Sequence, residues 1–289
     1  MVDAGAPVFV LALHPRSGTN FLSDLLSAHP LVDRSPVPED FIAERAGILS
    51  EYAENLVGKW EKYFDRGRLK REDYTADRLL CQFGQSLLAF IGQPNSERHM
   101  LLKTPALLDL PTLQRLFPTG QMLILLRDPR SIAESWLQSN FEDGASVESV
   151  GYRCAQNMRA LERWLNSGNK MADRERLHFV RFEELARSPC SEYQKILERI
   201  GLPYNAEAVA YAEDPPIIGS SFGNQDHKRR HRSSTPTFAP RRRPQGFDPT
   251  CRWAHWSIHT HRRFNRVCGS IMARWGYAPI TEQSHIIPE

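Results

Sequence analysis

The stretch VFVLALHPRSGTNFLSDLL, residues 8–26, decides the fold of this 289-residue chain. It begins with a short apolar run, passes through a turn containing Pro, Ser and Gly, and ends in a segment with helical periodicity. A buried parallel strand, a tight turn and an amphipathic helix produce this pattern. Backbone N–H groups and the helix dipole meet at such a turn. With the hydroxyls of Ser17 and Thr19 and the guanidinium of Arg16, they are predicted to bind one tetrahedral oxyanion.

Further apolar runs at 100–103, 122–127 and 177–182 have the length of buried strands. Helical patterns occupy the segments around 18–28, 75–92, 131–140, 146–166, 189–200 and 250–275. This alternation predicts an α/β fold, P-loop-like and three-layered, with a central parallel sheet flanked by helices. The hydrophobic content of 41% is enough for a sizeable core, so we expect one domain over residues 1–289.

Composition excludes several classes of protein. Charged residues make up 25% of the chain, as in ordinary globular proteins, and no apolar run is long enough to predict a membrane span. The first apolar run lacks the basic start of a signal peptide. The five cysteines are odd in number and include no CxxC pair, which argues against a disulfide framework and a zinc site. A reducing, cytoplasmic setting without membrane partners is therefore expected.

The positive charge of the chain is concentrated in one segment. Residues 227–243 hold seven of the 37 Lys and Arg residues and no acid, which leaves 30 basic against 34 acidic residues elsewhere. The segment belongs to a long stretch, 215–249, rich in Pro, Gly, Ser and Arg, which is predicted to be a mobile lid. A solvated loop, a lid over an anionic ligand and a nucleic-acid patch all have such a charge pattern.

The turn after the first strand differs from a nucleotide-kinase P-loop. That loop, GxxxxGK[ST], needs a Lys followed by a hydroxyl that binds Mg²⁺, and neither the Lys nor the spacing is present. The residues therefore indicate a metal-free transfer of an anionic group, and no metal site is expected. The bland alternative is a simple turn in which Ser17 caps the helix.

A second motif, LLRDPRSIAESW, covers residues 125–136. Its strand is predicted to end at Arg127, and Ser131 with Glu134 has the spacing of a capping box. Arg127 lies at the carboxyl end of a strand, where α/β sheets bind their ligands, and Ser135 can face the same crevice. These two residues are predicted to grip a second phosphate.

Several motifs together resemble the family of sulfotransferases that use PAPS, 3′-phosphoadenosine-5′-phosphosulfate. They are RSGT after the first strand, KTP at 103–105, RDPR with a serine eight residues after its first Arg, FEEL at 182–185, SSFG at 220–223, and FDP with RW within 247–253. The chain is most similar to the bacterial and tyrosylprotein-like branch, whose turn reads PRSGT. The classical cytosolic branch has Lys at the position of Arg16.

The resemblance implies that the 5′-phosphosulfate is held by Arg16, Ser17, Gly18, Thr19 and Asn20. It also implies that Arg127 and Ser135 hold the 3′-phosphate and that Phe182 touches the adenine. Ser221 and Lys228, in the predicted lid, are candidates for completing the 3′-phosphate site.

The catalytic base differs between the branches. Cytosolic members have a catalytic His where this chain has Pro105, whereas the tyrosylprotein-like branch takes a Glu from the segment after the first helix. Glu39 is the favoured base here, with Asp33 and Asp40 nearby; the alternative is that Glu39 is only a surface acid at the start of the next helix. Lys103 is expected to stabilise or protonate the bridging oxygen of the departing phosphate.

The expected activity is transfer of SO₃ from PAPS to a hydroxyl, or less readily an amine, of a small-molecule acceptor. Adenosine 3′,5′-bisphosphate, PAP, is the product, and Arg16 would steady charge on the sulfuryl group. The alternatives are a P-loop transferase that uses ATP and a nucleic-acid-binding protein that uses residues 227–243. Segments 41–99 and 215–249 are expected to form the acceptor pocket. The aromatic residues available there, Trp60, Tyr63, Phe64 and Tyr74, are equally suited to core packing.

Overall fold

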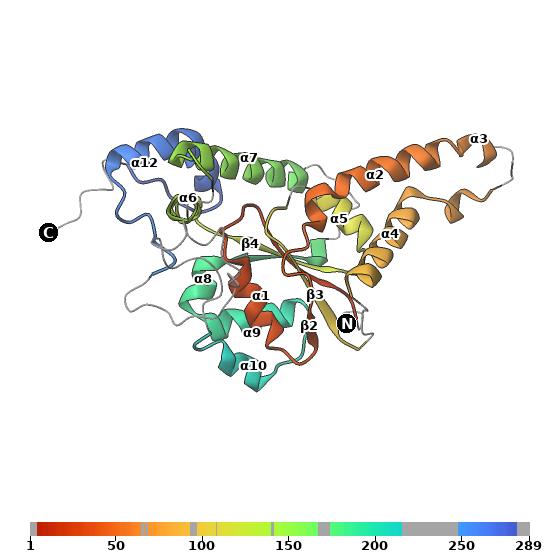
Figure 1. Cartoon of the computed structure of the whole chain (residues 1–289), viewed down its shortest axis with the longest axis horizontal. Coiled ribbons are helices and arrows are strands. Elements are labelled where there is room, and N and C mark those ends of the chain that lie inside the picture. The colour runs from red at the N-terminus through yellow and green to blue at the C-terminus, as the bar shows by residue number, and fades with distance from the viewer. Residues whose placement is uncertain are drawn as a thin grey trace.

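The fold is built on five parallel strands in the order β2-β3-β1-β4-β5. The computed structural model describes residues 5–64, 67, 69–92, 97–107, 109–139, 142–166, 174–215 and 248–281. The strands are β1 (Val8–Ala12), β2 (Val32–Arg34), β3 (His99–Thr104), β4 (Gln121–Leu126) and β5 (Leu177–Arg181). Helices cover both faces of this sheet (Figure 1), so the predicted three-layer α/β fold is confirmed.

The position of β1 explains why its sequence is apolar throughout. All five of its residues are buried, because successive side chains point to opposite faces and both faces are covered. Phe9 and Leu11 join the core on one face of the sheet, whereas Val8 and Val10 join the core on the other. β1 lies between β3 and β4, so the turns that follow these three strands meet at one edge of the sheet.

The helices divide between the two faces of the sheet. Helix α1 (Thr19–Ser27) packs on one face with α8 (Phe182–Arg187), α9 (Pro189–Arg199) and α10 (Ala206–Tyr211). The other face is covered by α2 (Ile42–Gly58), α4 (Ala76–Ile91), α5 (Leu110–Leu116), α6 (Pro129–Gln138), α7 (Val147–Asn166) and the C-terminal helices α12 (Ile258–Phe264) and α13 (Ser270–Arg274). The remaining elements are α3 (Glu61–Phe64), three short 3₁₀ or π turns, namely η1 (Arg71–Asp73), η2 (Arg174–Arg176) and η3 (Asn265–Gly269), and the loops between them.

Helices α2 and α4 form a pair that projects away from the sheet (Figure 1). At its tip Trp60 packs edge-on against Tyr74, with ring centroids 6.0 Å apart. Phe64 lies nearby under the guanidinium of Arg71. These aromatic side chains therefore pack within the helical pair, which is the packing role that the sequence left open for them.

The last helix was expected to begin near residue 250, and this prediction is wrong. Helix α12 begins at Ile258, because the side chain of Ser257 accepts a hydrogen bond from the Thr260 N–H and caps the helix. Residues 248–256 instead form an irregular segment that crosses α6. The predicted capping box of α6 is also wrong: Asp128 is the N-cap, and its side chain accepts from the N–H of Arg130 at 2.8 Å.

Part of the predicted lid cannot be compared with the structure. Residues 216–247, which include Ser221, Lys228 and all of the basic segment 227–243, lie outside the described residues. None of the helices in the described ranges is both long and apolar enough to span a bilayer.

Candidate functional site

The turn between β1 and α1 depends on a glycine for two reasons. Gly18 is the N-cap of α1 and has φ of 100°, in the left-handed region that favours glycine. A Cβ at this position would also lie 2.5 Å from the ring of Phe182. Gly18 therefore sets both the direction of α1 and the close approach of Phe182 to the turn.

The side chains of the turn are already partly engaged with the protein. The hydroxyl of Ser17 donates to the carbonyl oxygen of His14 at 2.6 Å and closes the turn. Arg16 also has a left-handed backbone, with φ of 76°, which is uncommon for a residue with a Cβ. The start of α1 thus presents backbone N–H groups, while Arg16 is turned toward α6.

Two guanidinium groups meet at Ser135 of α6, and that of Arg127 is joined to them through the backbone of Arg16. Arg16 Nε and Arg252 Nη1 both donate to the Ser135 hydroxyl oxygen, each at 3.1 Å. Arg127, at the end of β4, donates from Nη1 to the Arg16 carbonyl oxygen at 2.7 Å. We call Arg16, Arg127 and Arg252 with Ser135 the arginine cluster. The structure brings together the Arg127 and Ser135 regions predicted for the 3′-phosphate and joins them to the turn.

Like charges lie close together in the arginine cluster. Burial, together with the nearby charge of Arg252, lowers the pKa of Arg127 to about 9. Burial and Arg252 likewise lower the pKa of Arg16 to about 10. Arg127 Nε is buried and has no hydrogen-bond partner within the described part of the chain. An anion with several oxygens would relieve the like-charge repulsion and satisfy this donor.

Phe182 supports the turn and the cluster together. The Arg127 guanidinium lies 4.2 Å from its ring centroid, Gly18 approaches its edge, and only 5% of the residue is exposed. Phe21 of α1 makes an edge contact with the same ring. Little of the ring is open to a ligand here, so an adenine contact at Phe182 stays a prediction.

Lys103, at the end of β3, lies on the other side of the α1 terminus. Its Nζ donates to Oδ1 of Asn20 and pairs with Oε1 of Glu39 at 3.2 Å, and the residue is only 7% exposed. Burial lowers the pKa of Lys103, and Glu39 partly opposes that shift. The structure therefore brings the predicted catalytic Lys103 and Glu39 into contact with each other and with the turn.

The two other candidate bases have different partners. Asp40 Oδ1 accepts from the Thr104 hydroxyl and from the N–H of Ile42 at 3.0 Å, which ties it to the start of α2. Asp33 pairs with Arg98 at 2.7 Å. Of the three acids, Asp40 has the helix-starting role that was the alternative for Glu39, and Glu39 contacts Lys103.

A cavity of about 230 Å³ opens beside Lys103 and Asn20. Its lining comes from α1, the end of β2, the loop after it and β3: Asn20, Ser23, Arg34, Ser35, Pro36, Val37, Pro38, Leu101 and Lys103. None of these residues belongs to segment 41–99, so the acceptor pocket expected there is not this cavity. Pro36 and Pro38 give it a wall with restricted backbone freedom.

Arg252 is the residue of this site that sequence reasoning missed. The RW pair within 247–253 belonged to the resemblance, but no role followed for its arginine. In the structure Arg252 extends from residues 248–256 across α6 to Ser135. Among the described residues, no three His, Cys, Asp or Glu side chains gather as a metal-binding group.

Comparisons with known proteins show which proteins this chain is similar to. The model of a family described as the sulfotransferase family matches residues 7–206. The chain is 24% identical over 223 residues to a putative protein-tyrosine sulfotransferase of Caenorhabditis briggsae, covering 74% of this chain and 71% of the relative. It is 23% identical over 283 residues to protein-tyrosine sulfotransferase 1 of Danio rerio, covering 94% and 73%.

Solved structures show the same fold. The sulfotransferase domain from the curacin biosynthetic pathway has a TM-score of 0.51 and 16% identity, with 95% of this chain and 99% of that domain covered. A sulfotransferase from Alicyclobacillus acidocaldarius has a TM-score of 0.50 and 14% identity, with 93% of each chain covered.

Proposed function

This chain belongs to the sulfotransferase family, and we propose that it moves a sulfuryl group from PAPS to a hydroxyl acceptor without a metal ion, leaving PAP. The observation that carries the proposal is the placement of two chemically different groups of residues beside one turn. The arginine cluster lies toward α6, and the Lys103–Glu39 pair lies toward the cavity. The arginine cluster is suited to binding anionic phosphate. The Lys103–Glu39 pair is suited to transferring a proton and to stabilising a departing oxyanion.

The arginine cluster fits the phosphate end of the donor. Charge-assisted hydrogen bonds from guanidinium groups to phosphate are short and strong. Two such groups donate to Ser135, and the third, Arg127, donates to the backbone of Arg16. The buried, unpartnered Nε of Arg127 is a donor that a phosphate oxygen can satisfy. We assign Arg127, Ser135 and Arg252 to the 3′-phosphate. The α1 terminus, with residues 16–20, is assigned to the 5′-phosphosulfate.

Catalysis would then use the other end of the turn. Bound PAPS would supply a sulfuryl group attached to phosphate through a bridging oxygen. Lys103 Nζ, held between Asn20 and Glu39, would place positive charge beside that oxygen. Glu39 would accept the proton of the acceptor hydroxyl. Arg16, which reaches from the turn to Ser135, would steady charge on the transferred group.

The cavity beside Lys103 is assigned to the acceptor. Its volume of about 230 Å³ admits one ring-sized or chain-like end of a molecule. Apolar atoms of Pro36, Val37 and Leu101 form part of its wall, while Lys103 and Asn20 lie at the reacting end. A small hydroxyl compound therefore fits better than a bulky one.

Binding measurements separate this proposal from an ATP-using transferase and from a nucleic-acid-binding protein. Thermal unfolding would be followed with PAP, ATP and an oligonucleotide at equal low concentrations, because a ligand that binds the native state raises the melting temperature. We expect the largest rise with PAP. A larger rise with ATP or with the oligonucleotide would overturn the proposal.

A direct assay tests the reaction itself. The enzyme with PAPS would be incubated with a panel of alcohols, phenols, sugars and amines, and the products analysed by mass spectrometry. The expected result is the gain of one sulfuryl group on a hydroxyl compound, together with formation of PAP in equal amount. Sulfation of amines alone would contradict the hydroxyl assignment.

A further inference from the structure

One face of α6 is used as a docking surface for residues 248–256, which we call the strap. Ser131, Glu134, Ser135 and Gln138 lie three or four residues apart and so share that face. Ser131 Oγ donates to the Thr250 carbonyl oxygen at 2.7 Å, and Arg127 Nη2 donates to the carbonyl oxygen of Pro249. The strap is therefore fixed to the site by both its backbone and its side chains.

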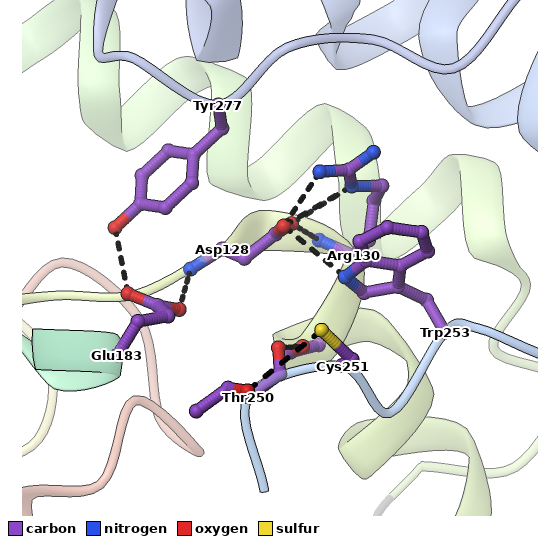
Figure 2. A network of polar contacts seen from close by, with 8 residues as sticks. Asp128, Arg130, Glu183, Thr250, Cys251, Trp253 and Tyr277 are labelled. Carbon is purple, nitrogen blue, oxygen red and sulfur yellow. Dashed lines mark hydrogen bonds and ion pairs between the residues drawn. The ribbon is translucent and has the colours of Figure 1, made fainter. Parts of the chain in front are cut away.

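A buried network fixes the strap on the far side of Arg252 as well (Figure 2). Arg130 pairs with Asp128 at 2.7 Å and lies 3.8 Å over the ring of Trp253. Trp253 Nε1 also donates to Asp128 Oδ2 at 3.1 Å. The N–H of Asp128 donates to Glu183, which also accepts from Tyr277. Because residues 250 and 253 are both held, the position of the intervening Arg252 backbone is well defined.

A fixed backbone does not by itself fix the rotamer of the long Arg252 side chain. Gln138 restricts the rotamers that this side chain can adopt. Arg252 Nη2 donates to Gln138 Oε1, while Nη1 of the same guanidinium donates to Ser135 Oγ. The planar guanidinium fork is thus held at two points on α6. This orientation aims it at Ser135, where Arg16 also donates.

The orientation of the Gln138 amide is itself determined by Glu134. Gln138 Nε2 donates to Glu134 Oε1, and Trp256 Nε1 donates to the other carboxylate oxygen at 2.7 Å. A carboxylate only accepts hydrogen bonds, so the NH₂ of the amide must face it and the amide oxygen must face Arg252. Glu134, which the sequence suggested as half of a capping box, thus acts on Arg252 through Gln138.

A neutral amide has an advantage over an acid at this position. It holds the guanidinium by a hydrogen bond and adds no negative charge of its own beside the arginine cluster. Arg252 is buried enough that its pKa is lowered, and the charge of Glu134 opposes that shift from one step further away.

We propose that Gln138 is a positioning residue for the donor: held by Glu134, it aims Arg252 at Ser135 and thereby sets the preference for a nucleotide that bears a 3′-phosphate. The proposal rests on the assignment of the arginine cluster to the 3′-phosphate. It adds that this preference is built partly by a residue that does not touch the ligand.

The test compares two nucleotides that differ only in the 3′-phosphate. Calorimetry would measure the dissociation constants of PAP and of adenosine 5′-monophosphate for the full chain and for Gln138→Met, which keeps the side-chain length and removes the amide. We expect PAP to bind about three- to tenfold more weakly and adenosine 5′-monophosphate to bind unchanged. Turnover at saturating PAPS should stay close to that of the wild type. Gln82→Met, at an exposed site on α4, is the matched control.

A double-mutant cycle shows whether Gln138 acts through Arg252. Arg252→Ala alone should lower the affinity for PAP, and adding Gln138→Met to that variant should lower the affinity no further. If Gln138→Met does not fold, Gln138→Asn, which keeps the amide but shortens its reach, provides the same comparison.

Three results would overturn the positioning role while leaving the proposed function intact. Each applies where Arg252→Ala lowers the affinity for PAP. The first is an unchanged affinity of Gln138→Met for PAP, and the second is an equal loss of affinity for both nucleotides. The third is a double mutant whose loss of PAP affinity equals the sum of the two single losses. Failure of the proposed function has a different signature. In that case the wild-type chain would bind PAP no more tightly than adenosine 5′-monophosphate.

Discussion

The two ends of the β1–α1 turn balance their charges in different ways. Toward α6, Arg16 and Arg252 donate to one neutral hydroxyl and Arg127 donates to the Arg16 backbone. Burial, together with the charge of Arg252, lowers the pKa values of Arg16 and Arg127. Toward the cavity, Lys103 pairs with Glu39, and Arg34, which also lines the cavity, pairs with Asp24. An excess of positive charge suits tight binding of an anion, whereas a matched acid and base suit the movement of a proton. The first end should therefore govern donor affinity and the second end turnover.

Removal of the proposed base should produce the largest effect. Glu39→Gln should lower turnover by about 10² to 10⁴ and leave the affinity for PAP nearly unchanged, because the carboxylate acts on the acceptor proton and on Lys103 rather than on the 3′-phosphate. Steady-state kinetics and calorimetry measure the two quantities. Turnover should fall more with alkyl alcohols as acceptors than with acidic phenols. Glu51→Gln, at an exposed site on α2, is the control. Equal losses for both acceptors would point to another group.

Lys103 should show the same separation with a smaller loss. Lys103→Ala should reduce turnover by about 10² to 10³, because its contact strengthens as the bridging oxygen gains charge. PAP affinity should change by far less, as judged by calorimetry on the same protein. The exposed Lys59→Ala is the matched control. A defect confined to PAP binding would remove Lys103 from the catalytic residues and make the two ends alike.

At the other end, the effect should fall on affinity and only for the 3′-phosphate. Arg127→Ala should lower the affinity for PAP by about 10- to 150-fold, since one charge-assisted hydrogen bond is lost. The affinity for adenosine 5′-monophosphate should barely change. Ser135→Ala should act in the same direction but less. Arg127 also holds the Arg16 carbonyl and the Phe182 ring, so Arg127→Lys and a thermal melt accompany the measurement. Equal weakening of both nucleotides would mean that Arg127 only supports the turn.

The pH dependence of binding should sharpen the comparison further. The pKa of Arg127 in the free protein is lowered to about 9, and a bound phosphate would raise it, so binding takes up a proton above that pH. PAP affinity should be flat between about pH 7.5 and 8.5 and then fall about tenfold per pH unit above about pH 9. Adenosine 5′-monophosphate, which makes no 3′-phosphate contact, should lose less. Parallel curves for the two nucleotides would contradict the assignment.

The sequence allowed the regular parts of the fold to be predicted because their periodicity is strong. The runs at 8–13 and 122–127 became β1 and β4 within a residue, since fully buried strands are apolar throughout. β2 is only three residues long and one of them is exposed, so it left no such pattern.

The site was predictable where it follows a strand and not where it depends on tertiary contacts. Arg16, Lys103 and Arg127 each lie at the end of a buried strand, a place that topology itself marks. Arg252 lies in an irregular segment, and its partners on α6 are more than 110 residues away in the chain. Nothing local to Arg252 indicates that Gln138 and Ser135 will meet it.

The left-handed backbone of Arg16 has a consequence for how this protein would respond to selection. A residue with a Cβ in that conformation costs on the order of 1 kcal/mol or more relative to glycine. Selection for heat resistance alone would therefore favour glycine at position 16. The same change would remove a guanidinium from Ser135. A thermostable relative that keeps arginine here must therefore gain its stability from substitutions at other positions.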